Sequence, residues 1–154
     1  MDQPLLSCDE SYMRMALDLA REAGSAGEVP VGAVVVLDNR VIGRGRNSPI
    51  ASNDPTAHAE ILAIREAGAA IGNYRVENTT LYVTIEPCAM CAGAIVAARI
   101  ARVVFGARDL RFGAIRSKFR VADSELLNHR AAIVEGVLGP ECTGLMQAFF
   151  AQRR

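Results

Sequence analysis

Four residues of this chain could together activate a water molecule. His58 and Glu60 form a His-x-Glu motif, and Cys88 and Cys91 form a Cys-x-x-Cys motif directly after Pro87. One imidazole and two thiolates can hold three corners of a tetrahedral zinc ion and leave the fourth corner for water, which is typical of catalytic zinc. Zinc lowers the pKa of such a water from about 15.7 to near 7. Glu60 is then available to move protons between the water and a substrate.

The spacing inside each motif indicates how the side chains reach one site. Cys88 and Cys91 are three residues apart, so on a helix their sulfur atoms face the same side. The positive end of the helix dipole favours a thiolate at Cys88, and only the thiolate binds metal. Residues two apart on an ideal helix point about 200° apart. We therefore expect His58 to precede the regular turns of the helix that carries Glu60.

Hydrophobic periodicity and capping residues predict the elements that carry these motifs. The expected helices are 7–24, which begins at a Ser7–Glu10 capping box, 57–69, 88–98 and 140–154, the last with Leu145, Phe149 and Phe150 facing inward. The expected strands are 31–37, 41–46, 79–85, 102–106 and 131–137. Residues 47–56 are expected to form a polar loop, and 107–130 a long basic segment with a helical turn at 124–127. This alternation predicts a single α/β domain over residues 1–154.

Charge and hydropathy narrow the functional classes. The formal net charge is zero, so the total charge gives no information about nucleic-acid binding. Residues 99–120, however, contain seven arginine or lysine side chains and one acidic residue, Asp109. Such a cluster either contacts RNA phosphates or is a solvated surface whose counter-charges lie elsewhere. No apolar run approaches the roughly 20 residues of a membrane helix, and no signal peptide is evident, so we expect no membrane partner and a cytoplasmic location.

Several stretches around the two motifs extend the pattern, namely Asn47–Ile50, Asp54–Glu60, Thr84–Ala94, Arg102–Asp109 and Asn128–Arg130. With them, nearly the whole chain resembles the bacterial tRNA-specific adenosine deaminases of the cytidine/deoxycytidylate deaminase-like superfamily. The pattern H-x-E…P-C-x-x-C is itself typical of zinc nucleobase deaminases. The resemblance implies a three-layer α/β/α cytidine deaminase-like fold with a five-stranded mixed sheet flanked by helices. It also implies hydrolysis of adenosine to inosine at the wobble position of a tRNA anticodon, with one Zn²⁺ per subunit.

The same resemblance implies roles for individual residues and a homodimer that binds the tRNA anticodon stem-loop. It makes His58, Cys88 and Cys91 the zinc ligands and Glu60 the catalytic proton shuttle. The substrate-binding residues that it implies are Asn47, Ala59, Arg108, Asp109, Asn128, His129 and Arg130. Two alternatives remain open, because Asn47 could instead be a loop or capping residue and Asp109 a local partner of Arg108 or Arg111. The chain departs from the family pattern at Phe112, which stands where a small polar residue is expected. Phe112, Phe119 and Phe149 are candidates for stacking on bases, although a core position is favoured for Phe149.

Three competing functions use part of the same pattern. A zinc deaminase of a free base or nucleoside, of the guanine or cytidine type, would share the zinc ligands and Glu60 but would need no basic segment. A catalytically silent RNA-binding subunit would not need Glu60. A redox or structural Cys-x-x-Cys protein would leave the His-x-Glu motif unexplained. The basic residues of 99–120 favour an RNA substrate over a free base.

Overall fold

The structure, a computed structural model, describes residues 3–153, with side chains from Cys8 onward. Its centre is a five-stranded sheet in the order β2-β1-β3-β4-β5. The strands are β1 (Gly32–Leu37), β2 (Arg40–Arg46), β3 (Thr80–Ile85), β4 (Arg102–Ala107) and β5 (Ala132–Glu135). β1 runs antiparallel to β2 and β3, whereas β3, β4 and β5 are parallel. The mixed five-stranded sheet that the sequence predicted is therefore confirmed.

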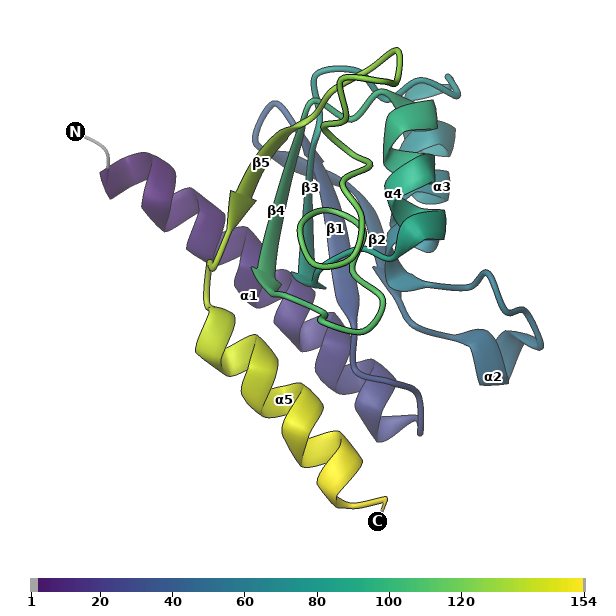
Figure 1. Ribbon diagram of the computed structural model, residues 1–154, viewed down its shortest axis with the longest axis vertical. Helices are drawn as coiled ribbons and strands as arrows, with labels where there is room; N and C mark the ends of the chain where they lie inside the picture. Colours follow the sequence, from purple (N-terminus) through teal and green to yellow (C-terminus); the bar gives the residue numbers. More distant parts are fainter. Residues whose placement is uncertain (1–2, 154) are drawn as a thin grey trace.

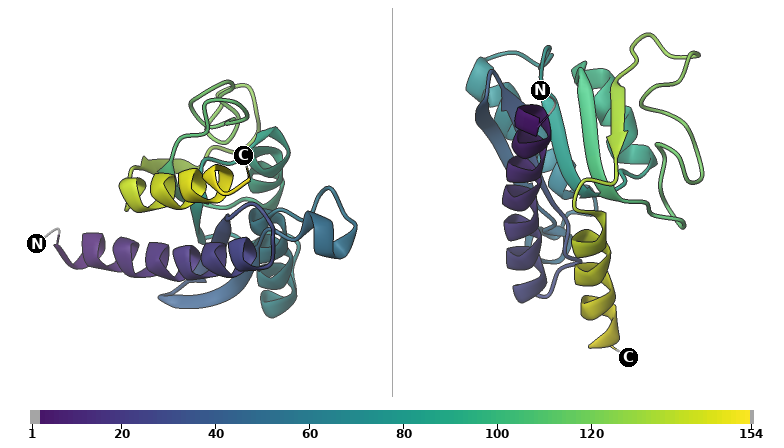
Figure 2. Two further views of the ribbon diagram at one scale, coloured as in Figure 1. Left: turned by 90° about the horizontal axis from the view of Figure 1, so that it is seen from below. Right: turned by 90° about the vertical axis from the view of Figure 1, so that its left-hand side faces the viewer.

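Helices cover both faces of the sheet. Figure 1 shows α3 (Ala59–Ile71) and α4 (Ala89–Ala98) to the right of the sheet, and α1 (Gln3–Ser25) and α5 (Gly139–Ala151) on its other side, to the lower left. Figure 2 shows the same three layers from below and from the side, with α1 and α5 next to each other. A short helix, α2 (Pro49–Ser52), projects from the segment between β2 and α3. The predicted three-layer α/β/α arrangement is confirmed.

Burial on both faces explains the composition of the central strands. β1 and β3 are almost continuously buried, and strands covered on both sides are typically uninterrupted runs of β-branched and other apolar residues. The predicted apolar stripe of α1 is fully buried against the sheet: Met13, Ala16, Leu17, Ala20 and Ala23. No helix among residues 3–153 is long and apolar enough to cross a membrane.

Several predicted boundaries were wrong. α1 begins at Gln3, so Ser7 lies inside the helix and is not its N-cap; Pro4, a residue favoured in first turns, was the overlooked signal. Residues 124–127 form only turns and bends. Phe149 is buried at 8% exposure, but Phe150 is 45% exposed, because neighbouring helical residues point about 100° apart and cannot both face inward.

The predicted polar loop at 47–56 contains the helix α2, which the sequence did not reveal. Pro49 occupies one of its first positions, where the missing N–H costs nothing. The Glu28 carboxylate accepts hydrogen bonds from the backbone N–H groups of Ile50 and Ala51, at 3.2 and 2.8 Å. Glu28 is 22 residues away from Ile50 in the sequence, so a local pattern could not show that this turn is capped.

Candidate zinc and substrate site

The three predicted metal ligands lie together at one end of the sheet. His58 Nδ1 is 3.6 Å from Cys88 Sγ and 3.5 Å from Cys91 Sγ, and all three ligand atoms lie within 4.8 Å of one another. Ordinary zinc–nitrogen and zinc–sulfur bonds in a tetrahedral site place N and S about 3.6 Å apart. An imidazole with two thiolates is also a donor set that suits zinc. The residues present therefore fit one zinc ion in this subunit.

Helix starts position the ligands. His58 is the N-cap of α3 with extended backbone, φ −76° and ψ 152°, so it precedes the regular turns, as the sequence predicted. Cys88 is the N-cap of α4, φ −75° and ψ 178°, and Cys91 lies in the first turn of that helix. β3 ends at Ile85 and leads directly into Cys88. The site thus lies at the carboxyl ends of parallel strands, where open α/β sheets bind ligands.

The close approach of the ligands shifts their pKa values. Hydrogen bonding from Cys91, with a further contribution from His58, lowers the pKa of the Cys88 thiol to about 4, although burial opposes this. The pKa of Cys91 is raised, since it shares its proton with Cys88 and is buried. The hydrogen bond to Cys88 raises the pKa of His58. Of the two cysteines, Cys88 is therefore the one that favours the thiolate form. Metal binding releases the protons that remain on the other ligands.

Glu60 lies beside the ligands as the second residue of α3. Glu60 is only 4% exposed, and this burial raises the pKa of its carboxyl group to about 7. The charge of Cys88 acts in the same direction, whereas His58 and a hydrogen bond with Cys91 lower the pKa. A carboxyl group with such a pKa can accept and release a proton near neutral pH. Gly45 on β2 lets α3 approach this closely, because a Cβ at that position would collide with the carbonyl oxygen of Ala59.

Asn47 joins the end of β2 to the start of α3. Its Oδ1 accepts a hydrogen bond from the backbone N–H of Ala59, at 2.9 Å, so it does act as a cap for the helix that carries Glu60. This bond uses only the carbonyl half of the amide, and the NH₂ group is the half suited to donate to a ligand. Ala59 itself is fully buried, and its N–H is already paired with Asn47.

Arg108 and Asp109 follow β4 at the same end of the sheet, but both have local partners. Arg108 binds Glu135 through two hydrogen bonds, at 2.8 and 3.2 Å. Asp109 Oδ1 accepts from the backbone N–H groups of Arg111 and Phe112, at 3.0 and 3.2 Å. The Asp109 side chain thus stabilises a turn, in line with the local role that the sequence left open.

The segment Asn128–Arg130 lies at the other end of the sheet. His129 Nε2 hydrogen-bonds the carbonyl of Ile100, at 2.7 Å, just before β4 begins. Arg130 donates to the carbonyl of Asp123. His129 contacts the chain just before β4 begins, whereas the zinc ligands lie at the end of the sheet where β4 finishes. The length of β4 therefore places the segment about 17 Å from the zinc ligands along the strand direction. The structure does not bring these three residues to the zinc site of the same chain.

Much of the charge in 99–120 is neutralised by acidic residues from other parts of the chain. Arg102 pairs with the buried Asp9, at 2.6 Å, and Arg116 and Arg120 share Asp123. With Arg108 bound to Glu135, four of the seven basic side chains have carboxylate partners. Arg111, Lys118 and Arg99 have no carboxylate partner among the described residues. The counter-charges that the sequence left open are therefore present, and they leave a smaller basic surface.

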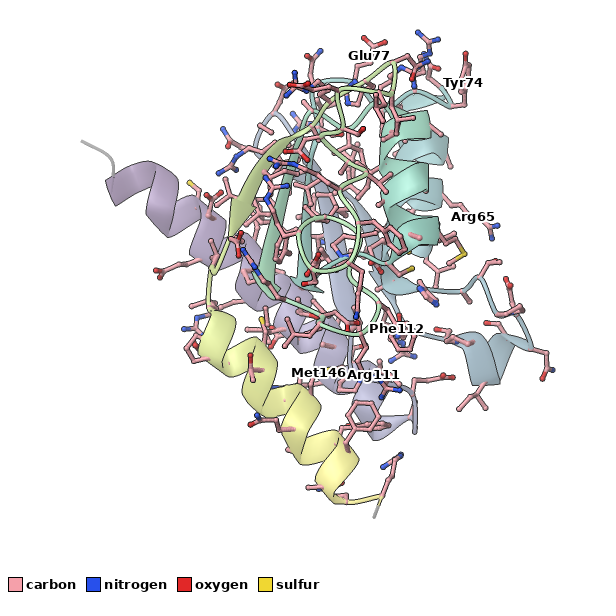
Figure 3. All side chains as sticks on the ribbon, viewed as in Figure 1. Arg65, Tyr74, Glu77, Arg111, Phe112 and Met146 are labelled. Atoms are coloured by element: carbon pink, nitrogen blue, oxygen red, sulfur yellow. The ribbon has the colours of Figure 1, made fainter. Side chains whose placement is uncertain are left out.

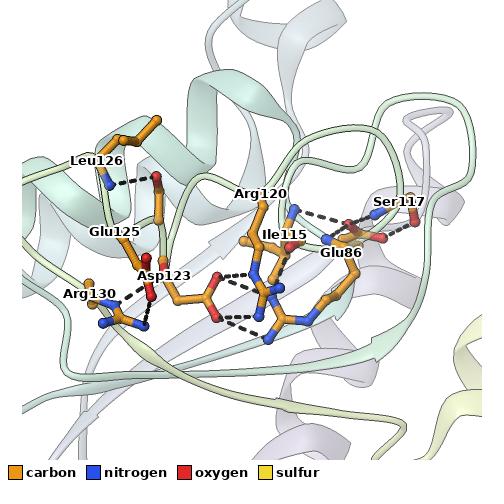
Figure 4. A network of polar contacts seen from close by, with 10 residues as sticks. Glu86, Ile115, Ser117, Arg120, Asp123, Glu125, Leu126 and Arg130 are labelled. Atoms are coloured by element: carbon orange, nitrogen blue, oxygen red, sulfur yellow. Dashed lines mark hydrogen bonds and ion pairs between the residues drawn. The ribbon is translucent and has the colours of Figure 1, made fainter.

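The sequence missed Glu86, which organises the loop beside the ligands. Its buried carboxylate accepts from the backbone N–H groups of Asp109, Ile115, Arg116 and Ser117, and from the Ser117 hydroxyl. Although burial acts in the opposite direction, these bonds hold the pKa of Glu86 below its usual value. Figure 4 shows this cluster beside the one centred on Asp123. A charged residue directly after a buried strand was the signal that could have identified it.

Sequence comparisons relate the chain to zinc-dependent deaminases. Residues 6–107 match the family model of the cytidine and deoxycytidylate deaminase zinc-binding region. The chain is 53% identical over 147 residues to the tRNA-specific adenosine deaminase of Haemophilus influenzae, covering 95% of this chain and 85% of that protein. It is 46% identical over 146 residues to that of Bacillus subtilis, covering 95% and 91%.

Solved structures agree with these relatives. The chain is similar to a structure from a study of A-to-I editing by tRNA:A34 deaminases at the wobble position of transfer RNA. That likeness has a TM-score of 0.85 and 45% identity, covering 88% of this chain and 98% of that one. A guanine deaminase from Nitrosomonas europaea has a TM-score of 0.80 at 24% identity, covering 92% and 84%. At that identity the likeness shows the fold alone.

Proposed function

The chain belongs to the cytidine and deoxycytidylate deaminase family, and within it to the tRNA-specific adenosine deaminases, and on that premise we propose that it hydrolyses adenosine to inosine at the wobble position of a tRNA anticodon. One observation carries the proposal: a buried Glu60 stands against a His58, Cys88 and Cys91 set with zinc spacing. This occurs in a chain 53% identical to a tRNA-specific adenosine deaminase. We further propose that residues 1–154 act as one catalytic domain.

We infer the following division of labour for the reaction. When bound by His58, Cys88 and Cys91, zinc supplies a water that is a competent nucleophile near neutral pH. Glu60 accepts a proton from that water and delivers it to the adenine ring nitrogen beside the amine-bearing carbon. The oxygen of the water bonds to that carbon, and Glu60 then passes the second proton of the water to the amino group. The carbon–nitrogen bond breaks and ammonia leaves, so that adenosine and water give inosine and ammonia. A pKa near 7 suits a group that must take and give protons in turn.

Asn47 is our candidate for orienting the target base. Its Oδ1 is held by the N–H of Ala59, which fixes the plane of the amide beside the zinc ligand His58. The NH₂ group can then donate to an acceptor on the N7 edge of adenine. The family resemblance adds Ala59, the first residue of α3, to the substrate-binding residues. Arg108 and Asp109 flank the same end of the sheet, whereas Asn128, His129 and Arg130 would meet the RNA away from the reacting base.

A homodimer is supported by the outer face of α4. The helix has no charged or strongly polar side chain, and its solvent-facing positions are Ala89, Met90, Gly93, Ala94 and Ala97. A helix that is apolar all round is normally buried on all sides. We propose that a second copy of the chain covers this face. A tRNA substrate also favours the cytoplasmic location that the sequence predicts.

The competing function, deamination of a free base or nucleoside, differs in substrate and not in chemistry. The test is to incubate the zinc-loaded protein with an anticodon stem-loop carrying a wobble adenosine and, separately, with adenosine, cytidine and guanine, and to follow ammonia release. Turnover of the stem-loop, with the small molecules unchanged, supports the proposal. Turnover of a small molecule, with the RNA unchanged, would place the protein in nucleotide salvage.

A further inference from the structure

An exposed aromatic side chain lies beside the zinc site and has no role in the proposed chemistry. Phe112 is 61% exposed, and the guanidinium of Arg111 lies 5.2 Å from the centroid of its ring. Figure 3 labels the two residues close together at the end of the sheet where α4 begins. A single exposed apolar side chain is common on protein surfaces, so the case for a ligand depends on how firmly this ring is held beside the zinc site.

The turn that carries Phe112 is held in place before any ligand binds. Asp109 Oδ1 accepts from the backbone N–H groups of Arg111 and Phe112, and the carbonyl of Asp109 accepts from the N–H of Gly113, at 2.8 Å. The N–H of Asp109 donates to Glu86, at 3.1 Å. These four bonds fix the backbone on both sides of the ring, so that binding a ligand there requires little further ordering.

The same turn is connected to a zinc ligand through its backbone. Gly113 pairs with Cys88 in an isolated antiparallel bridge, and the N–H of Ala114 donates to the carbonyl of Pro87, at 2.8 Å. Paired residues in such a bridge have Cα atoms about 5 Å apart. A Cβ at position 113 would collide with the Glu86 carboxyl group, so only glycine permits this approach. Phe112 is therefore one residue away from the partner of Cys88.

We propose that Phe112, with Arg111 beside it, is a stacking platform for an unpaired nucleobase next to the target adenosine. The inference rests on the proposed function and names a contact for the flanking nucleotide. A base must leave its stack to reach a zinc site, so its neighbours are splayed as well. Every base has a π-face that stacks on an aromatic ring, and an adjacent arginine strengthens the contact and approaches the phosphate. The cationic Arg111 disfavours a positively charged partner at the same place.

The chain provides a matched control for the test. Tyr74 is 77% exposed and also has an arginine beside its ring, with the Arg75 guanidinium 5.7 Å from the ring centroid, but Figure 3 shows it at the opposite end of the sheet from Phe112. Binding of an anticodon stem-loop is measured by fluorescence anisotropy in a Glu60→Gln background, so that the RNA is not converted. We expect Phe112→Ala to weaken binding on the order of tenfold, Phe112→Trp to retain it, and Tyr74→Ala to leave it unchanged. Zinc content and the thermal unfolding temperature should be the same in all variants.

RNA variants then identify the stacked base. Each nucleotide flanking the target adenosine is replaced in turn by an abasic residue. For one position, the loss caused by Phe112→Ala should disappear, because no base remains to stack. The proposal is overturned if the loss persists with every abasic RNA, if Tyr74→Ala weakens binding equally, or if Phe112→Ala changes the oligomeric state of the protein in solution. If the unmutated protein makes no inosine but Phe112→Ala still weakens binding, the proposed function fails and the platform stands.

Discussion

Two regions of the molecule meet at Cys88, and they are fixed in different ways. The zinc site is fixed locally, because His58 and Cys88 are the N-caps of two helices and their partners lie within the next turn. The long loop, residues 108–131, has no regular helix or strand. Its shape depends on carboxylates, above all on Glu86, which lies more than twenty residues earlier in the sequence. Short sequence motifs therefore determine the position of the zinc ligands and Glu60. Hydrogen bonds between distant residues determine the shape of the loop beside them.

The largest effect should come from the proton-transfer group of the locally fixed region. Glu60→Gln retains the size of the side chain and removes its proton transfer, so kcat should fall about 10²- to 10⁴-fold. Zinc content should not change, since Glu60 is not one of the three ligands. The measurement is single-turnover inosine formation together with metal analysis. Full turnover with full zinc content would remove Glu60 from the mechanism.

The next effect concerns the anchor of the long loop. Glu86→Gln places an NH₂ group against several backbone N–H donors, which removes acceptors in a buried site. We expect the free energy of unfolding to fall by about 1 to 3 kcal/mol, and the amides of residues 115–117 to exchange with solvent faster. Denaturant unfolding and hydrogen exchange measure both quantities.

The exposed Glu77 gives the control for the loop anchor. Glu77→Gln should change the free energy of unfolding by less than about 0.5 kcal/mol. If the two variants behave alike, Glu86 does not anchor the loop.

A smaller effect is expected at the second carboxylate of the loop. Although burial raises it, hydrogen bonds from Arg116 and Arg120 hold the pKa of Asp123 below its ordinary value. The stabilisation is therefore present above the ordinary aspartate pKa of about 3.9 and is lost as the pH falls through the lowered value. Asp123→Asn should cost about 1 kcal/mol at pH 7. This difference from the unmutated protein should shrink below about pH 4, as unfolding at several pH values would show.

The smallest effect is expected farthest from the zinc ligands. Arg130 is exposed, and its ion pair with Glu125 is long, at 3.9 Å, so Arg130→Gln should leave the stability within about 0.5 kcal/mol. If Arg130 meets an RNA phosphate, the slope of log K against log salt should decrease in magnitude by a little less than 1, with kcat unchanged. A decrease in kcat would show that the two ends of the sheet are coupled in the reaction.

The sequence predicted what short-range geometry determines. The apolar stripe of α1, the position of His58 ahead of α3 and the facing sulfurs of Cys88 and Cys91 all follow from periodicity and helix starts. The sequence did not predict α2, because the distant Glu28 carboxylate caps its backbone N–H groups. It did not predict where the turn at Phe112 lies, because the distant Glu86 holds that turn through the N–H of Asp109.

Charge was harder to interpret than hydrophobicity for the same reason. The sequence left open whether Arg102 and Arg108 have carboxylate partners; the structure pairs them with Asp9 and Glu135, 93 and 27 residues away. A local count of charges includes the arginines and omits their partners. Only the folded chain shows which basic side chains are left for RNA.

The most direct test of the proposed function is to determine at which position of an RNA the protein makes inosine. The zinc-loaded protein is incubated with an anticodon stem-loop that carries a wobble adenosine and other unpaired adenosines, and inosine is mapped by position, with Glu60→Gln as the background. We predict inosine at the wobble position alone. Inosine at other unpaired adenosines to the same extent, or no inosine from a protein with full zinc content, would contradict the account.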